Sequence, residues 1–203
     1  QKGMAAGERL DGASMAKAHA VWLEAQQAML KAASAINELG VQKSWPGWLL
    51  EPFGFVDVVC TSTDWKNFFS QRNHESAQPE MEHLAAMMNK AYILSLPTPR
   101  KWKEWHLPLI KQEDENQFSH EQLKQISADR CARVSYTNHE GVRDPQQDIE
   151  LYHRLISARP AHNSPFEHQA TPTNWRDGDD IAYVGNFRGW KQQRMEMVGE
   201  SGA

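Results

Sequence analysis

The segment that most constrains this chain runs from Ala161 to His168 and reads AHNSPFEH. Its proline fixes its own φ and biases Ser164, the residue before it, toward extended backbone, which predicts a rigid turn. The turn contains a serine, a glutamate and two histidines, and it leads into an expected strand over Gln169 to Thr173. Two interpretations stay open: a ligand site, or a surface loop that Phe166 anchors in the core while the polar side chains face water.

The same residues support a metal site less well than either of these interpretations. The two histidines, His162 and His168, lack the i, i+4 spacing that places two imidazoles on one face of a helix. Cys131 is the candidate for a third ligand, and it lies far away in the sequence. We therefore predict no metal site.

Length and charge exclude several classes of protein. A chain of 203 residues can bury a sizeable core within one domain. The net charge of −4 and the scattered basic residues argue against binding a nucleic acid polymer by counterion release. Two cysteines give no disulfide framework, and no apolar run approaches the roughly 18 residues of a membrane span. We expect a cytoplasmic protein that binds neither a nucleic acid polymer nor a membrane.

The first part of the chain alternates between regular and broken patterns. Apolar residues recur at threes and fours from Ser14 to Leu39, which predicts a long amphipathic helix with Gly40 at its C-cap. Its apolar stripe suits a subunit interface or the core, and we expect the core. Val41 to Pro52 contains a Pro-Gly pair and is expected to break regular structure. Phe53 to Thr61 is rich in aromatic and β-branched residues, which predicts a buried strand.

Further helices are expected after Thr63 or Asp64, with three aromatic residues inward, and from Ser76 to Tyr92. Leu96 to Glu115 has several prolines and no clean period, which is typical of a connector.

The last part of the chain contains clear helix starts. Ser119 and Gln122 form a capping box, and Asp144 followed by Pro145 opens another helix. A second strand is expected over Ile181 to Trp190.

Three segments together resemble the flavin-dependent thymidylate synthases. CARVSY at Cys131 to Tyr136, an expected helix, and AHNSPFEH are similar to the family's ARVS segment, helix and G-H-x-[ST]-P-F-E-H turn, which holds FAD. NFFSQRNHESAQPE at Asn67 to Glu80 resembles the family segment N-F-L-x-L-R-x-x-x-x-A-Q-x-E. In the ordinary family this last segment follows the other two, whereas here it precedes them. The chain therefore resembles a circularly permuted, phage-type relative.

The resemblance implies an α+β fold in which helices pack on a mainly antiparallel sheet, in permuted order and as one compact domain overall. Residues 1–95 would form a helical half, residues 96–118 a connector, and residues 119–203 the half with the ARVS and SPFEH flavin motifs. The family's assembly implies a homotetramer with sites shared between subunits. A phage gene would place the protein in the host cytoplasm.

The resemblance also implies an activity: reductive methylation of dUMP to dTMP, with methylenetetrahydrofolate as the one-carbon donor and NADPH as the reductant. FAD would carry the hydride, since cofactor chemistry is intrinsic and the protein supplies orientation. Carried over by position, the FAD contacts would be Asn67, Ser135, His162, Ser164 and Glu167.

Arg72 matches the family arginine that lies against the uracil of dUMP. A guanidinium there stabilises negative charge on the pyrimidine and raises the electron density at C5, which implies a catalytic role. Arg188 and Arg194 would complete substrate binding. Taken without the family, Arg72 is better interpreted as a surface arginine paired with Glu75 or Glu80.

The chain also departs from the family. The R-H-R-x(7)-S-R signature is absent, and Gln192 and Gln193 stand where its first arginine and its histidine would fall. Trp48 occupies a position that resembles another nucleotide-contacting arginine of the family. The sequence begins at Gln1 without a methionine, in a stretch like a polar linker, so we expect further residues upstream. The absence of the signature then fits a missing N-terminal segment as well as it fits a loss of activity. A non-catalytic flavin-binding, nucleotide-binding or structural descendant and a related pyrimidine-modifying enzyme stay open as alternatives.

Overall fold

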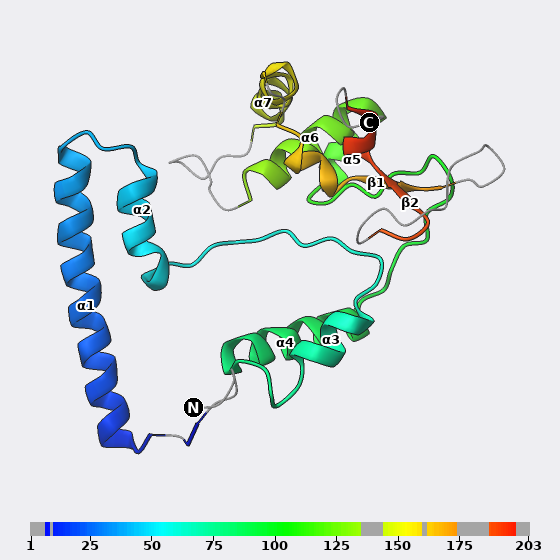
Figure 1. The fold of residues 1–203 in the computed structure, drawn as a ribbon. Coiled ribbons are helices and arrows are strands. Elements are labelled where there is room, and N and C mark those ends of the chain that lie inside the picture. The colour runs from blue at the N-terminus through cyan, green and yellow to red at the C-terminus, as the bar shows by residue number, and fades with distance from the viewer. Residues whose placement is uncertain (1–6, 9, 135–143, 160–161, 174–186, 198–203) are drawn as a thin grey trace. The chain divides into compact units, whose positions relative to one another are not determined.

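The structure is a computed structural model that describes residues 7–8, 10–134, 144–159, 162–173 and 187–197 (Figure 1). Its contacts divide the chain into two compact units. The first comprises Gln1–Val56 with His74–His83, and the second comprises Asp57–Asn73 with Leu84–Ala203. The division into residues 1–95, 96–118 and 119–203 refers to chain order in a permuted relative and stays a prediction.

The first unit is dominated by α1, Gly12–Glu38. Asp11 caps its start, because the Asp11 side chain accepts a hydrogen bond from the Ser14 N–H at 2.7 Å. Gly40 follows its end with a φ of +73°, the left-handed conformation that glycine adopts without a Cβ penalty. The predicted helix and its glycine C-cap are confirmed.

Two predictions about the partners of α1 are wrong. The apolar stripe of α1 does not lie in a hydrophobic core. Ala33 is the only buried residue of this helix, which is described over its whole length. Residues 41–52 are not irregular either: α2, Ser44–Leu50, packs beside α1, and the 3-10 helix η1, Glu51–Phe53, follows it. Pro46 is tolerated because it lies in the first turn of α2, where a backbone N–H has no partner within the helix.

The buried strand predicted over Phe53 to Thr61 is also wrong. Residues 54–61 form no regular structure, and the Phe55 side chain is fully exposed at 106%. β-propensity measures how well a residue fits a pleated, half-buried surface. A segment with high β-propensity therefore does not form a strand unless another strand pairs with it.

Helix α3, Lys66–Arg72, and helix α4, Pro79–Leu94, confirm the two helices expected next. The aromatic side chains before and within α3 form a half-buried cluster. The Trp65 and Phe69 rings stack with centroids 5.9 Å apart, and Phe69 lies 5.7 Å from Tyr92 of α4.

Helix α6, His120–Ala132, is the centre of the second unit, and most of its side chains are buried. Its predicted capping box is confirmed, since the Ser119 N–H donates to Gln122 Oε1 at 3.0 Å. Helix α7, Pro145–Ser157, begins at the predicted Asp144 cap and packs on α6. Their shared apolar core contains Ala128, Tyr152 and Phe166.

The described strands form one small antiparallel sheet. Strand β1, Ala170–Pro172, pairs with β2, Trp190–Gln192, in the register Ala170 to Gln192. β1 lies within the predicted strand. Of the second predicted strand, residues 181–186 lie outside the described residues, and β2 begins only at Trp190. Two 3-10 helices, η2 (Ser164–Glu167) and η4 (Gln193–Glu196), adjoin the sheet. The α+β class is confirmed at this level.

The predicted connector is irregular from residue 96 to 105, but its second part belongs to the packed unit. His106 bridges to Ala170 of β1, with His106 N–H to Ala170 O at 2.7 Å. Helix α5, Gln112–Glu115, ends the segment and contributes the buried Asp114. Among the described residues, no helix combines the length and apolar character that a membrane crossing needs.

Candidate functional site

The SPFEH turn is held in place by its apolar residues. The Phe166 side chain has 0% exposure, and its ring lies 5.4 Å from that of Tyr152 on α7. The fully buried amide of Gln169 donates to Pro165 O at 3.0 Å and accepts from Ser127 Oγ at 3.2 Å, in the orientation that satisfies it. Buried side chains thus anchor the turn, and its rigidity stays a prediction. Ser164, however, begins the helix η2 instead of adopting the extended backbone expected before proline.

Three of the predicted FAD contacts line one pocket of about 550 Å³, which we name the SPFEH pocket. His162, Ser164 and Glu167 supply polar groups to it. The remaining lining comes from the segment before α3, from α6 and α7, and from the turn itself: Val59, Cys131, Ala132, Leu155, Pro165 and His168. The pocket therefore combines apolar walls with one carboxylate, one hydroxyl and two imidazoles.

Two side chains that follow Lys191 in the sequence contact Glu167. Gln192 of β2 donates from Nε2 to the Glu167 carbonyl oxygen at 2.7 Å, and Arg194 of η4 pairs with the Glu167 carboxylate. Arg194, which was predicted to bind substrate, thus lies beside a predicted cofactor contact. The family resemblance did not indicate this ion pair.

The protonation states of the pocket follow from burial. Desolvation lowers the pKa of His168, which favours a neutral ring at neutral pH, and its Nδ1 lies 3.1 Å from Thr61 Oγ1. Desolvation raises the pKa of the Cys131 thiol to about 12. Because the thiolate is the nucleophile and the metal ligand, Cys131 is inert in this environment.

A second pocket, of about 480 Å³, includes Thr61 in its lining, and we name it the Arg100 pocket. Thr61 bonds to His168, which lines the first pocket, so one hydrogen bond connects the linings of the two pockets. The Arg100 pocket is lined by hydroxyl groups, one guanidinium, one imidazole and two aromatic rings: Thr61, Ser62, Thr63, Thr98, Arg100, His106, Phe187 and Trp190. Burial, Arg100 and His168 together lower the pKa of His106.

Sequence reasoning missed the Arg100 pocket. Arg100 and His106 lie in the segment that was interpreted as a passive connector, and the only signal was the run of hydroxyls at Thr61, Ser62 and Thr63. Arg188, predicted to bind substrate, lies at its edge. The Arg188 N–H donates to Thr63 Oγ1 at 2.7 Å, and its guanidinium is 3.4 Å from Asp64.

The structure does not bring the remaining predicted residues to either pocket. Asn67 and Arg72 lie on α3, are exposed, and line neither pocket. The Asn67 side chain accepts from Gln71 Nε2 at 3.0 Å. Ser135 lies outside the described residues. The predicted roles of these three residues stay predictions.

Arg133, the arginine of the ARVS motif, belongs to a network of ion pairs within the second unit. Arg133 donates from Nε to Asp129 at 2.7 Å and from Nη2 to Asp148 at 2.5 Å. Asp148 also accepts from Arg130 Nε at 3.2 Å, and Arg130 pairs with Asp114 of α5. This ionic network joins α5, α6 and α7, and α6 and α7 also contribute residues to the SPFEH pocket.

The two adjacent pockets can bind a ligand that has both planar and polar parts. Apolar walls and aromatic rings suit planar groups, while the hydroxyl, imidazole, carboxylate and guanidinium groups suit sugars and phosphates. The raised pKa of the Cys131 thiol argues against a cysteine nucleophile at this position. Compared with known proteins, the chain matches no family model, no curated protein sequence and no solved structure.

Proposed function

We propose that this chain is a flavin-dependent thymidylate synthase of permuted order, with that family's fold, and that it binds FAD in the SPFEH pocket. It would convert dUMP to dTMP with methylenetetrahydrofolate and NADPH, as a cytoplasmic homotetramer. The observation that supports the proposal best is the shared pocket: His162, Ser164 and Glu167, assigned to FAD by resemblance, face one cavity. Because these three are close in sequence, the closure of that cavity by Val59 and Leu155 adds independent support.

The donor set of the SPFEH pocket fits the nucleoside part of FAD. The carboxylate of Glu167 and the hydroxyl of Ser164 suit ribose hydroxyls, and the apolar wall suits a planar ring. No lysine or arginine lines this pocket among the residues that the structure describes. Charge for the pyrophosphate would come from Arg194 at its edge. When bound, FAD supplies hydride transfer, and these residues orient it.

The Arg100 pocket is the proposed place of the pyrimidine nucleotide. A guanidinium at Arg100 suits a phosphate, and Trp190 with Phe187 suits a planar base. The hydrogen bond of Thr61 that connects the two linings would keep the base beside the cofactor. Arg72 lies on the exposed face of α3 and would act on a site shared with another subunit, as the family resemblance implies.

Titration of the full chain with FAD, followed by flavin absorbance and fluorescence, tests the cofactor assignment. We expect His162→Ala/Glu167→Ala to weaken binding at least tenfold, because it removes two polar groups of the pocket. The matched control is His153→Ala/Glu150→Ala, which removes the same residue types from the exposed face of α7. A chain without a flavin band in excess FAD, or equal losses in the two variants, rejects the assignment.

Calorimetric titration with dUMP tests the nucleotide site. We expect Arg100→Gln to weaken dUMP binding roughly ten- to hundredfold, since one charge-assisted contact to phosphate contributes ~1.5–3 kcal/mol. Lys101→Gln is the control, because Lys101 is exposed and lines no described pocket. Equal effects of the two substitutions contradict the proposed site.

A specific observation favours the non-catalytic alternative. Gln192 and Gln193, which replace an arginine and a histidine of the family signature, are buried, and Gln192 bonds to the backbone of the SPFEH turn. They support the fold instead of facing a nucleotide. Release of tritium from C5 of labelled dUMP separates the two functions: FAD binding without tritium release, with all co-substrates present, identifies a non-catalytic flavoprotein.

A further inference from the structure

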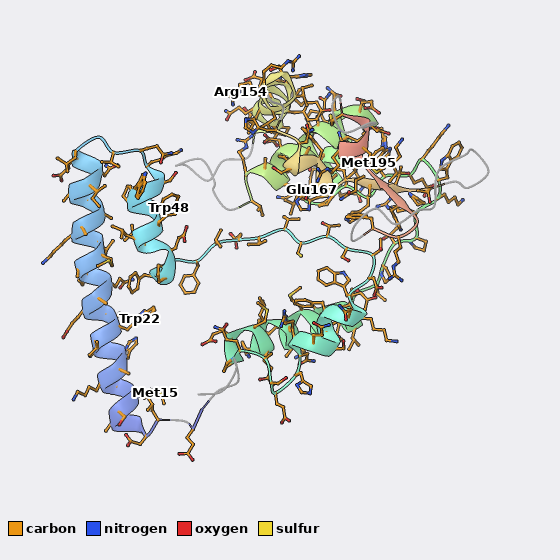
Figure 2. The ribbon with its side chains drawn as sticks, in the orientation of Figure 1. Met15, Trp22, Trp48, Arg154, Glu167 and Met195 are labelled. Carbon is orange, nitrogen blue, oxygen red and sulfur yellow. The ribbon has the colours of Figure 1, made fainter. Side chains whose placement is uncertain are left out.

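Helix α1 presents an unusually apolar surface to solvent. Helix α2 and η1 cover one of its faces, where the Trp22 and Phe53 rings lie 5.0 Å apart. Elsewhere large apolar side chains are exposed, including Val21 at 57% and Leu39 at 81%. Met15 and Trp22 project from the helix in Figure 2. Exposed apolar surface of this extent is typical of an interaction face.

Apolar residues of this surface, all exposed except the half-buried Ala32, follow a regular pattern. Seven positions recur with spacings that alternate between three and four, and we name them the alanine row: Ala18, Val21, Ala25, Ala28, Ala32, Ala35 and Leu39. This alternation is the heptad pattern with which one helix packs along another. Small side chains along the row allow a short distance between the two helix axes.

A groove also lies along α1, and Ala28 is the one residue of the alanine row that lines it. It measures about 530 Å³ and is lined by Ala20, Leu23, Glu24, Gln27, Ala28 and Lys31. The groove occupies the middle of the helix, away from the face that contacts α2.

The charges of α1 indicate the orientation of the partner. Lys17, Glu24, Lys31 and Glu38 are the only lysine, arginine, aspartate or glutamate residues of this fully described helix, and they are seven residues apart with alternating sign. We name them the charged row. It lies directly beside the alanine row, in the flanking position where ion pairs between coiled-coil helices form.

The charged row complements itself in one orientation. In an antiparallel pair with a twofold axis near Gln27, Glu24 faces the partner's Lys31, and Lys17 faces the partner's Glu38. In the same pair, Ala25 packs near the partner's Ala28, and Ala18 near the partner's Ala35. A parallel pair in register would instead place the charged row opposite Trp22, Met29 and Ile36 of the partner, and it would form none of these ion pairs.

We propose that α1 is a self-association helix, which pairs antiparallel with α1 of a second copy of this chain through the alanine row, in a register selected by the charged row. This inference needs no flavin chemistry. It assigns a helix and a register to the self-association expected from the family resemblance.

Sedimentation velocity of the full chain over a range of concentrations tests the pairing. We expect Glu24→Lys and Lys31→Glu each to raise the dimer dissociation constant about tenfold or more, because each replaces two attractions with two repulsions. The double variant Glu24→Lys/Lys31→Glu restores both pairs and is expected to recover wild-type association. Lys90→Glu, an exposed charge change on α4, is the control.

A cross-linking experiment tests the orientation. In a Cys60→Ser background, which removes the exposed native thiol, Ala18→Cys mixed with Ala35→Cys is expected to form a mixed disulfide-linked dimer. Ala18→Cys alone is expected to form far less. A monomeric wild-type chain, a double charge variant that does not recover, or preferential Ala18→Cys self-linking overturns the proposal.

Discussion

Replacing Asp129 by asparagine should stabilise the protein above neutral pH. Asp129 has 0% exposure, and burial together with the neighbouring Asp148 carboxylate raises its pKa from 3.8 to about 7, against the opposing effect of Arg133. The network contains three carboxyl groups and two guanidiniums, so one proton neutralises it. A proton on Asp129 would also supply a donor at its buried Oδ1, which lacks a partner among the described residues.

The sign of the pH dependence follows from this shift. Between pH 3.8 and about 7 the folded chain retains a proton on Asp129 that the unfolded chain loses, so the free energy of unfolding falls as the pH rises. At 1.36 kcal/mol per pKa unit, the fall is on the order of 4 kcal/mol at most. The amide introduced by Asp129→Asn would keep the oxygen that Arg133 contacts and place an N–H₂ group where the proton lies.

Urea unfolding at pH 5 and pH 8 measures this effect. The wild type should lose stability between the two values, whereas Asp129→Asn should lose little, and the variant should therefore be the more stable chain at pH 8. Asp148→Asn is the contrast, because each Asp148 oxygen accepts from a different arginine, Arg130 or Arg133. An amide in its place turns an N–H₂ donor toward one of the two guanidiniums, so we expect a loss of ~1–3 kcal/mol at both pH values. An unchanged pH slope in Asp129→Asn refutes the reasoning.

Three further outcomes are expected. Phe166→Ala should cost ~3–5 kcal/mol in urea unfolding because it empties the core beside Tyr152, whereas Phe55→Ala, at a fully exposed position, should change stability by less than ~0.5 kcal/mol. Iodoacetamide at pH 8 should alkylate Cys60 and leave Cys131 unmodified, as measured by mass spectrometry, and equal labelling contradicts the burial of Cys131. Arg72→Lys should lower thymidylate formation roughly a hundredfold while NADPH still reduces the flavin, and turnover within a factor of about two defeats the role of Arg72.

The helix boundaries that were predicted correctly depend on local chemistry. Ser119 with Gln122, Asp144 with Pro145, and Gly40 each satisfy or end the backbone of their own helix, so a few adjacent residues determine them. The predictions that were wrong concern segments whose structure depends on residues far away in the sequence. The run from Phe53 to Thr61 has the composition of a strand, but no strand among the described residues lies beside it. Composition does not contain that information.

The same distinction applies to the candidate site. His162, Ser164 and Glu167 were found together because one turn contains them, and a turn is a local structure. The hydrogen bond at Thr61 and the Glu167 to Arg194 ion pair join segments that are far apart in the sequence. Asp114 was assigned to a connector, yet it forms a buried pair with Arg130. A single sequence shows which side chains are available and leaves their distant partners undetermined.

The motif residues therefore differ in what they imply about function. Arg133 of ARVS pairs with buried carboxylates, and Pro165 and Phe166 of SPFEH are buried, so packing alone would maintain all three in any protein with this local structure. His162 and Ser164 are exposed on the pocket, and packing gives no reason for an imidazole or a hydroxyl there. A shared motif made only of the buried residues would indicate a common fold. The exposed His162 and Ser164 favour a ligand. The alanine variants at His162 and Glu167 therefore distinguish a flavoprotein from a scaffold protein more sharply than any change at Phe166.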